Sequence, residues 1–557
     1  MSIATELTAL SGHITNAYDA VQTKGGTIPA NKNMANLDDA ILSIQSSADI
    51  TNGTKVQAKS SSGTIPASTF FEINNTGMKR SSEQNITSYR YAGQNPKTVQ
   101  LTENTFFSIY RSSTAKTIGA CVCQYNNGTL TVGTERVIAT NTFSTTYTPT
   151  MDSALTKISD NKVLVVYYDV NQSDSSKFSM YGVICTVSGT TITVGTPAVV
   201  VAEPYQTLGS VYPYAVMLSQ NTAILKYALK ANNTTAVALT ISGTTITVGT
   251  PATIDSYAPQ YNTIFRVSDT VLGMFGYSGR RVRAWDVASG TISNQREVVF
   301  TSRFEFGGMS GSSNNRYACV SSVPGTNYYI GVTAKAYAVV EFGTTDITIV
   351  DQNVLDTEAS SLMSHALVEV DDSSFIYACI RSSTSSATIT GTRLCGYRLV
   401  WDGTGIATTL YGDLDPNLSL PSSYSSNLML GLKTSMGSAF FLYPSNNSTS
   451  GALNGVVVDP QTGNSYPQGQ ISENTYSANS SSAIFSLSPT KSILFFPYTA
   501  SSSSYFKAML LDEVIIIDES ATRIDGVTAE DITDSSYGEA WVFEDEEFYG
   551  NADIRRF

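Results

Sequence analysis

Thr186-Val-Ser-Gly-Thr-Thr-Ile-Thr-Val-Gly-Thr-Pro-Ala198 and Thr240-Ile-Ser-Gly-Thr-Thr-Ile-Thr-Val-Gly-Thr-Pro-Ala252 are nearly identical stretches that begin 54 residues apart, at 186 and 240. A looser copy precedes them at residues 127–134, and more degenerate copies follow at 289–292, 343–349, 402–405 and 461–463. Each copy places a glycine turn between residues that favour strands, which is the pattern of a β-hairpin. The sequence therefore predicts one repeated hairpin along the middle of the chain.

Two further apolar runs belong to each repeat and precede its turn. The earlier runs are residues 106–110, 163–168, 223–228, 271–277, 317–323, 375–380, 439–443 and 493–498. The later runs are residues 118–124, 180–185, 237–241, 282–285, 336–342, 395–401, 453–458 and 506–511, and residues 514–517 are predicted as the fourth strand of the last unit. Repeats of roughly 50 to 60 residues with four strands each are typical of β-propeller blades. We predict a mainly β fold with an eight-bladed β-propeller over residues 97–518, and a seven-bladed one as the alternative.

The composition favours an all-β body without nucleic-acid or membrane partners. Only 14% of the residues are charged, and the net charge of −13 provides no basic field for phosphate backbones or anionic membranes. No apolar run approaches the roughly 18 to 20 residues of a membrane helix, and no basic region with an apolar core opens the chain. We expect a chain made without a secretory signal that does not insert into membranes.

The cysteine pattern favours buried free thiols. The six cysteines are Cys121, Cys123, Cys185, Cys319, Cys379 and Cys395. Each lies in an apolar run, and none has the two-residue spacing of a metal-binding pair, so disulfides and zinc ligands are the weaker interpretation for synthesis in a reducing cytoplasm. We expect no metal and no cofactor.

An apolar seam opens the chain. Its members, spaced 4, 3, 4, 3 and 4 residues apart, are Ile3, Leu7, Leu10, Ile14, Ala17 and Val21. This is a heptad pattern, and so short a helix gains stability by packing on copies of itself. It predicts an α-helical coiled-coil module over residues 1–46 that makes the protein a homo-oligomer, with a trimer as the expected state. The alternative is one amphipathic helix docked on its own domain.

A glycine-rich turn follows the seam. The turn is Lys24-Gly25-Gly26-Thr27-Ile28-Pro29, and its glycines and proline forbid continuation of the helix. A second short helix is predicted next, with its apolar face at positions 37, 40, 41 and 44. The stretches 7–10, 17–30 and Asn36-Leu-Asp-Asp-Ala-Ile41 resemble the N-terminal module of tailed-bacteriophage structural proteins, especially tail-fibre and related appendage proteins. The resemblance implies attachment of an oligomeric appendage to other virion proteins.

Two segments flank the predicted propeller. Residues 47–96 hold a second Gly-Thr-Ile-Pro-Ala, at 63–67, and are predicted to be a small linker or β module. Residues 522–527 resemble the start of a short strand module at the ends of phage virion proteins, and residues 519–557 are predicted to be an acidic tail. Such a charge run is a solvated tail by default. Because aromatic residues recur in it, we expect it to pack on a neighbouring subunit, with Trp541 and Phe543 as anchors.

Few residues offer catalytic chemistry. The chain has two histidines, His13 in the predicted helix and His365 beside an apolar run, and the latter is predicted to be structural. No nucleophile elbow, phosphate-binding loop or dinucleotide fingerprint occurs. The loop carboxylates are Asp371, Asp372, Asp413 and Asp415. Carboxylate pairs hydrolyse glycosides, but loop aspartates usually form turns. We predict that the protein is not an enzyme, with a polysaccharide depolymerase as the alternative.

Loops rich in tyrosine, asparagine and serine are the candidate ligand sites. Their tyrosines are Tyr205, Tyr214, Tyr257, Tyr261 and Tyr424. Loops held on rigid strands suit recognition, although these rings could equally cover blade edges. We predict a virion structural protein, made in the host cytoplasm, that presents its propeller to a host-surface glycan or protein. The alternatives are a head fibre or capsid decoration protein, and a baseplate or tail scaffold whose propeller binds other virion proteins.

Overall fold

The computed structural model describes residues 14–19, 21–22, 28–33, 36, 53–61, 63–87, 96–112, 117–140, 153–170, 178–202, 213–230, 233–257, 262–276, 281–300, 318–333, 336–355, 359–383, 392–416, 418, 429–444, 452–471, 482–488, 490–500, 503–519, 526–533 and 537–543. The chain divides into two compact units. Unit 1 combines Met1–Gly77 with Val514–Phe557, and unit 2 is Met78–Glu513. Unit 2 is therefore inserted between the two halves of unit 1.

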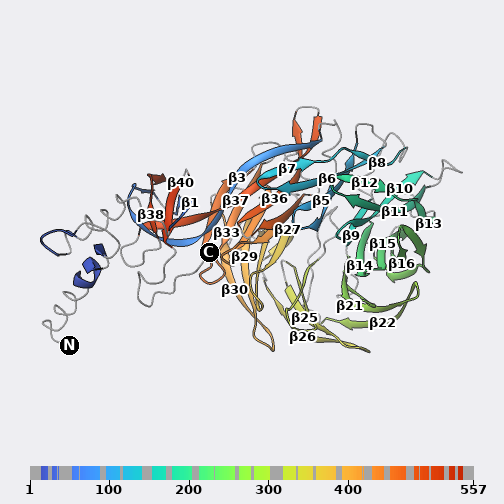
Figure 1. The fold of residues 1–557 in the computed structure, drawn as a ribbon. Helices are drawn as coiled ribbons and strands as arrows, with labels where there is room; N and C mark the ends of the chain where they lie inside the picture. The colour runs from blue at the N-terminus through green and yellow to red at the C-terminus, as the bar shows by residue number, and fades with distance from the viewer. Residues whose placement is uncertain are drawn as a thin grey trace. The chain divides into compact units, whose positions relative to one another are not determined.

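Unit 2 is an eight-bladed β-propeller, as predicted (Figure 1). Blade 1 contains β4 (Lys97–Thr102), β5 (Thr105–Arg111), β6 (Ile118–Asn126) and β7 (Thr129–Val132), and blade 2 contains β9 (Ala154–Ser159), β10 (Lys162–Val170), β11 (Phe178–Ser188) and β12 (Thr191–Val194). Blade 3 contains β14 (Tyr214–Ser219), β15 (Thr222–Lys230), β16 (Asn233–Ser242) and β17 (Thr245–Val248), and blade 4 contains β19 (Asn262–Ser268), β20 (Val271–Gly276), β21 (Arg281–Ala288) and β22 (Thr291–Val299). In blades 1 to 3 an extra strand, β8 (Arg136–Ala139), β13 (Ala198–Ala202) or β18 (Ala252–Asp255), also pairs with the third strand.

Blades 5 to 7 repeat this pattern, and blade 8 draws on both parts of the chain. Blade 5 contains β23 (Cys319–Ser322), β24 (Tyr328–Val332), β25 (Ala336–Phe342) and β26 (Ile347–Val354). Blade 6 contains β27 (Ala359–Glu369), β28 (Ser374–Ser383), β29 (Thr392–Trp401) and β30 (Ile406–Asp413). Blade 7 contains β31 (Leu430–Lys433), β32 (Ala439–Pro444), β33 (Leu453–Val458) and β34 (Ser465–Gln470). Blade 8 contains β35 (Ala483–Ser488), β36 (Lys491–Ala500), β37 (Ser503–Glu519) and β3 (Phe70–Thr87).

The fourth strand of blade 8 differs from the prediction. Residues 514–517 were predicted to form it, but no turn separates them from the preceding run, so they continue β37. The fourth strand is instead β3, from the N-terminal part of the chain, and Ser81 donates its hydroxyl to the carbonyl of Leu510 on β37. Blade 8 thus joins strands that lie more than 400 residues apart (81 to 510).

The propeller closes through the first strand of each blade. Successive first strands contact one another in the order β4, β9, β14, β19, β23, β27, β31 and β35, and β35 contacts β4. The first strands are therefore innermost. An apolar cluster fills each junction between neighbouring blades, as expected for blades that bury their faces on one another. At the closing junction, the rings of Phe106 in blade 1 and Phe495 in blade 8 lie 5.2 Å apart.

The predicted apolar runs correspond closely to these strands. Every later run lies in a third strand, and the earlier runs lie in second strands, except in blade 5. There the run 317–323 contains the first strand, β23, because the turn at Pro324-Gly325 comes after it, and the second strand is β24. The six cysteines are all buried and free, as predicted.

The repeated Val-Gly-Thr lets each hairpin approach the next blade. The predicted glycine turns all join third and fourth strands. In blades 1 and 3, Gly133 and Gly249 follow the fourth strand, and a Cβ atom there would lie 2.4 Å from the carbonyl oxygen of Thr190 and 1.9 Å from that of Gly290, respectively. Both of these oxygens belong to the hairpin turn of the following blade. Only glycine fits so close an approach of two backbones.

Unit 1 is built from both halves of the chain. Hydrogen-bonded neighbours follow the order β1 (Gly53–Ser60), β40 (Gly538–Phe543), β38 (Gly526–Thr528), β3 and β37, and β37 pairs in turn with β1. The pairing therefore closes on itself. Figure 1 shows β1, in blue, beside β40, in red, and Lys55 is the register partner of Trp541. A separate pair joins β2 (Thr64–Ile65) to β39 (Ile532–Thr533).

This organisation replaces the predicted boundaries at 96/97 and 518/519. Strands β1, β2 and β3, from the predicted linker or β module, pair with β40, β39 and β38, from the predicted tail. Trp541 and Phe543 lie on β40 of this pairing; their packing on a neighbouring subunit stays a prediction.

Only a short helix is described at the N-terminus. Residues 14–19 and 21–22 are helical, and buried Tyr18 and Val21 pack with Ile14 and Ile28 of the same chain. The Tyr18 hydroxyl donates to the carbonyl of Asn33 at 2.8 Å. Self-association of this helix stays a prediction. Among the other predicted seam and turn residues, Ala17 and Pro29 are half-buried, and Ile3, Leu7, Leu10 and 24–27 lie outside the described residues. No described helix is long and apolar enough to cross a membrane.

Candidate ligand-binding site

The two faces of the propeller differ in their connections. Since the strands of a blade run antiparallel, its first strand begins, its second ends and its third begins at the same edge. We call this edge the loop face. The opposite edge, the turn face, carries the turns between first and second strands and between third and fourth strands.

Two of the predicted tyrosines lie on the loop face of blade 3. Tyr214 begins β14 and Tyr257 follows β18, and each side chain is 41% exposed. Among the aromatic residues whose side-chain exposure the structure describes, they are the two exposed ones. Tyr205, Tyr261 and Tyr424 lie outside those ranges. The structure thus places the two candidates that it describes on the same face of one blade.

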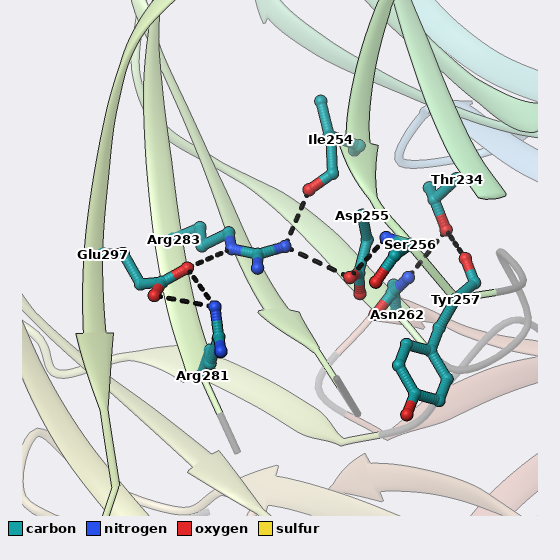
Figure 2. A network of polar contacts seen from close by, with 9 residues as sticks. All are labelled: Thr234, Ile254, Asp255, Ser256, Tyr257, Asn262, Arg281, Arg283 and Glu297. Atoms are coloured by element: carbon teal, nitrogen blue, oxygen red, sulfur yellow. Dashed lines mark hydrogen bonds and ion pairs between the residues drawn. The ribbon is translucent and has the colours of Figure 1, made fainter. Parts of the chain in front are cut away.

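A chain of buried hydrogen bonds supports both tyrosines. The Thr234 hydroxyl donates to the Tyr257 carbonyl at 2.6 Å, and the Asn262 amide nitrogen donates to the Thr234 oxygen at 2.7 Å (Figure 2). Buried Lys226 donates from Nζ to the Asn262 carbonyl at 2.6 Å. The same Nζ lies 5.7 Å from the centre of the Tyr214 ring, within cation–π range. The two tyrosines are therefore anchored to one network that spans blades 3 and 4.

Burial changes the charge state of Lys226. This side chain is 0% exposed, and burial disfavours the ammonium form. The pKa of Lys226 falls to about 7 as a result. Near neutral pH, a sizeable fraction of Lys226 is therefore uncharged.

An arginine network fixes the neighbouring part of the junction. Arg283 on β21 donates to the Ile254 carbonyl at 2.9 Å, to Asp255 at 3.2 Å and to Glu297 at 2.6 Å (Figure 2). Arg281 donates to both carboxylate oxygens of Glu297, at 2.9 and 3.1 Å. Burial alone would raise the pKa of Glu297, but the hydrogen bonds from the two arginines outweigh it and lower the pKa. Such charge-assisted contacts make the junction rigid.

The absence of a side chain at Gly276 leaves room for the side chains of this network. Gly276 ends β20 opposite Asn262, and a Cβ atom at this position would lie 2.8 Å from the Asn262 amide oxygen and 3.3 Å from an Asp255 carboxylate oxygen. A larger residue would therefore displace the groups that support the tyrosines. Sequence reasoning missed this junction, although Lys226 and Arg283 were visible as charges inside apolar runs.

Three of the candidate acid–base residues, Asp371, Asp415 and His365, make structural hydrogen bonds. Asp371 accepts backbone hydrogen bonds from Ser373 and Ser374 at 2.9 and 2.7 Å, as a turn former does. Buried Asp415 accepts from the Tyr443 hydroxyl at 2.6 Å, and burial raises the pKa of Asp413. His365 is buried and hydrogen-bonded to the Tyr377 hydroxyl at 2.9 Å, which fits the predicted structural role. Among the residues described, no cluster of histidine, cysteine or carboxylate side chains is placed to hold a metal.

A depression on the turn face was not predicted. It has a volume of about 860 Å³ and lies where the first turns of blades 8, 1 and 2 converge. Its lining includes Gln100, Glu103, Lys157, Asp160, Ser486 and Ser488. Gln100 donates to the Ser486 carbonyl at 3.0 Å across the closing junction, and Lys157 pairs with Asp160 at 2.8 Å. The hydrogen bond between Gln100 and Ser486 thus links blades 1 and 8 where the propeller closes.

The fold defines the chain as an eight-bladed β-propeller protein. Searches found no matching protein-family model and no matching curated sequence. Similar solved structures include the WD40 domain of SCAP from fission yeast, with 8% identity, a TM-score of 0.45, and coverage of 79% of this chain and 98% of that one. A protein from Lactobacillus plantarum has 11% identity, a TM-score of 0.39, and coverage of 69% and 98%. Trypanosoma rangeli sialidase has 12% identity, a TM-score of 0.32, and coverage of 75% and 55%. These low identities and TM-scores support no conclusion about activity.

Proposed function

We propose that the protein is a non-enzymatic structural component of a phage virion, of the tail-fibre or appendage type. Its N-terminal module attaches it to other virion proteins, and its propeller faces the host surface. The observation that carries this proposal is the resemblance of residues 7–41 to the N-terminal module of phage appendage proteins.

The division of the chain is consistent with this proposal. Strands from both ends of the chain pair within unit 1, whereas unit 2 is one continuous insertion. Unit 1 can therefore serve attachment while the loops of the propeller vary for recognition, as loops on rigid scaffolds do. The structural hydrogen bonds of Asp371, Asp415 and His365 agree with a binding role rather than catalysis.

Cryo-electron microscopy of the intact particle tests the proposal. We expect oligomers of the protein, anchored through the N-terminal module, with propellers that face solvent. Propellers enclosed by other virion proteins would contradict receptor binding and indicate a baseplate or tail scaffold. Attachment to the capsid would indicate a head fibre or decoration protein.

A second assay tests the absence of catalysis. Purified protein is incubated with host envelope polysaccharide, and new reducing ends are measured. We expect none above a heat-denatured control. Release of oligosaccharides, abolished by Asp413→Asn, would identify a depolymerase instead.

A further inference from the structure

The two tyrosines that the structure shows as exposed both belong to blade 3. The exposed large apolar side chains are Val137, Val199, Tyr214, Tyr257, Val299 and Leu410. Both tyrosines lie on the loop face of blade 3, whereas the aliphatic members lie on outer strands of blades 1, 2, 4 and 6. Aromatic rings that stay in water do not gain the free energy of burial. Two exposed tyrosine rings on one blade face therefore indicate a contact surface.

The backbone of Tyr257 and the ring of Tyr214 contact the buried network before any ligand arrives. Thr234 fixes the backbone of Tyr257 by accepting from Asn262 and donating to the Tyr257 carbonyl. Tyr214 is the register partner of Lys226, which donates to the Asn262 carbonyl. The Tyr257 ring points away from the network (Figure 2). A binding surface built in this way loses little conformational entropy when it is occupied.

The chemistry of the surface favours a sugar over a protein. A stable protein interface buries about 800 Å² on each partner around an apolar core. Two separate rings among polar groups do not supply such a core. A pyranose has an apolar C–H face for each ring and hydroxyls for the neighbouring polar groups, and tyrosine combines an apolar body with a polar tip. The half-exposed Arg281 is neutralised by Glu297, so this described arginine offers no unpaired charge to select an acidic sugar.

We infer that the loop face of blade 3 is a carbohydrate-binding platform, in which Tyr214 and Tyr257 stack on neutral sugar residues of a surface glycan. This inference rests on the proposed function and assigns it a site and a ligand class.

The test uses the full chain and saturation-transfer NMR with methyl glycosides of neutral hexoses, N-acetylhexosamines and uronic acids. Wild-type protein should bind at least one neutral glycoside. Tyr214→Ala and Tyr257→Ala should each weaken binding about tenfold, whereas Tyr214→Phe and Tyr257→Phe, which keep the rings, should stay within about threefold. Leu410→Ala is the matched control, since it removes an exposed apolar side chain from blade 6. Thermal unfolding should be unchanged in all five variants because the side chains are exposed.

Binding to host cells separates this inference from the proposed function. Periodate treatment of the cells, which destroys sugars, should abolish binding of the wild-type protein, and protease treatment should not. Loss after protease alone, full binding by the Tyr→Ala variants, or a preference for uronic acids would overturn the carbohydrate platform and leave a receptor-binding role intact. If untreated cells bind no wild-type protein, the receptor-binding role itself fails.

Discussion

Units 1 and 2 are both closed, unit 1 by a ring of strand pairings and unit 2 by contacts between the first strands of neighbouring blades, but they draw on the chain differently. In blades 1 to 7, the four main strands pair in the order in which they follow one another in the sequence. In unit 1, β1 pairs with β40, and Lys55 lies opposite Trp541. Closing so long a loop costs more chain entropy than forming a hairpin. The propeller therefore depends on local repeats, and unit 1 depends on the meeting of two distant segments.

Deletion of residues 526–557 should have the largest effect, because it should unfold unit 1 and leave the propeller folded. The deletion removes β38 and β40, two of the five strands in the closed pairing of unit 1. We expect hydrogen exchange to show loss of amide protection in β1, while β10, β15 and β28 in the propeller stay protected. Deletion of residues 544–557 is the control, because it leaves every described strand intact. Unchanged protection of β1 in the larger deletion would show that unit 1 does not need its C-terminal half.

Gly249→Ala should strongly destabilise the propeller and leave unit 1 unaffected. Its Cβ atom would lie 1.9 Å from the Gly290 carbonyl oxygen, and two backbones cannot separate without moving blades 3 and 4 apart. We expect a loss of about 3 kcal/mol in the free energy of unfolding, measured by denaturant titration. The matched control is Gly243→Ala, in the hairpin turn of the same blade. There φ is +63° and no atom lies within 4 Å of the added Cβ, so only backbone strain of about 1 kcal/mol is expected. Equal losses would show that the blades are not in close contact here.

Lys226→Met should remove a pH dependence of the propeller's free energy of unfolding. The folded pKa of about 7 lies below the ordinary value of 10.5, so the unfolded chain binds more protons between these values. Stability therefore rises with pH in this window, by about 2 kcal/mol from pH 7 to pH 9. The methionine variant should be more stable than wild type at pH 7, and the difference should shrink by that amount at pH 9. Parallel stability curves for the two proteins would contradict a depressed pKa.

The blades could be predicted because each one contains its own signals. A glycine turn lies between the third and fourth strands of seven blades, and every third strand is an uninterrupted apolar run. The fourth strand of blade 8 could not be found in this way. Its sequence includes Asn75, Lys79, Arg80 and Ser81, which show no strong apolar alternation, and its partner β37 is remote in sequence. Nothing local indicated that 53–77 would pair with 526–543.

The site was predictable only in its exposed part. Tyr214 and Tyr257 stood out because tyrosine in polar loops is a common recognition residue. Their shared support was not predictable, because Lys226, Thr234 and Asn262 come from three strands of two blades. The available signal in the sequence was Lys226, a charged residue inside an apolar strand, because a buried charged group needs a polar partner. Its partner, however, depends on the packing of one blade on the next.

The most direct test of the two-unit account replaces Met78–Glu513 with an Asn-Gly turn and records an amide-correlation NMR spectrum of the remaining chain. If the propeller is an insertion into a module formed by both chain ends, the shortened chain should give well-dispersed β-strand signals and unfold cooperatively. Narrowly dispersed signals, with no cooperative transition, would contradict the account and show that the two ends of the chain cannot fold together without the propeller.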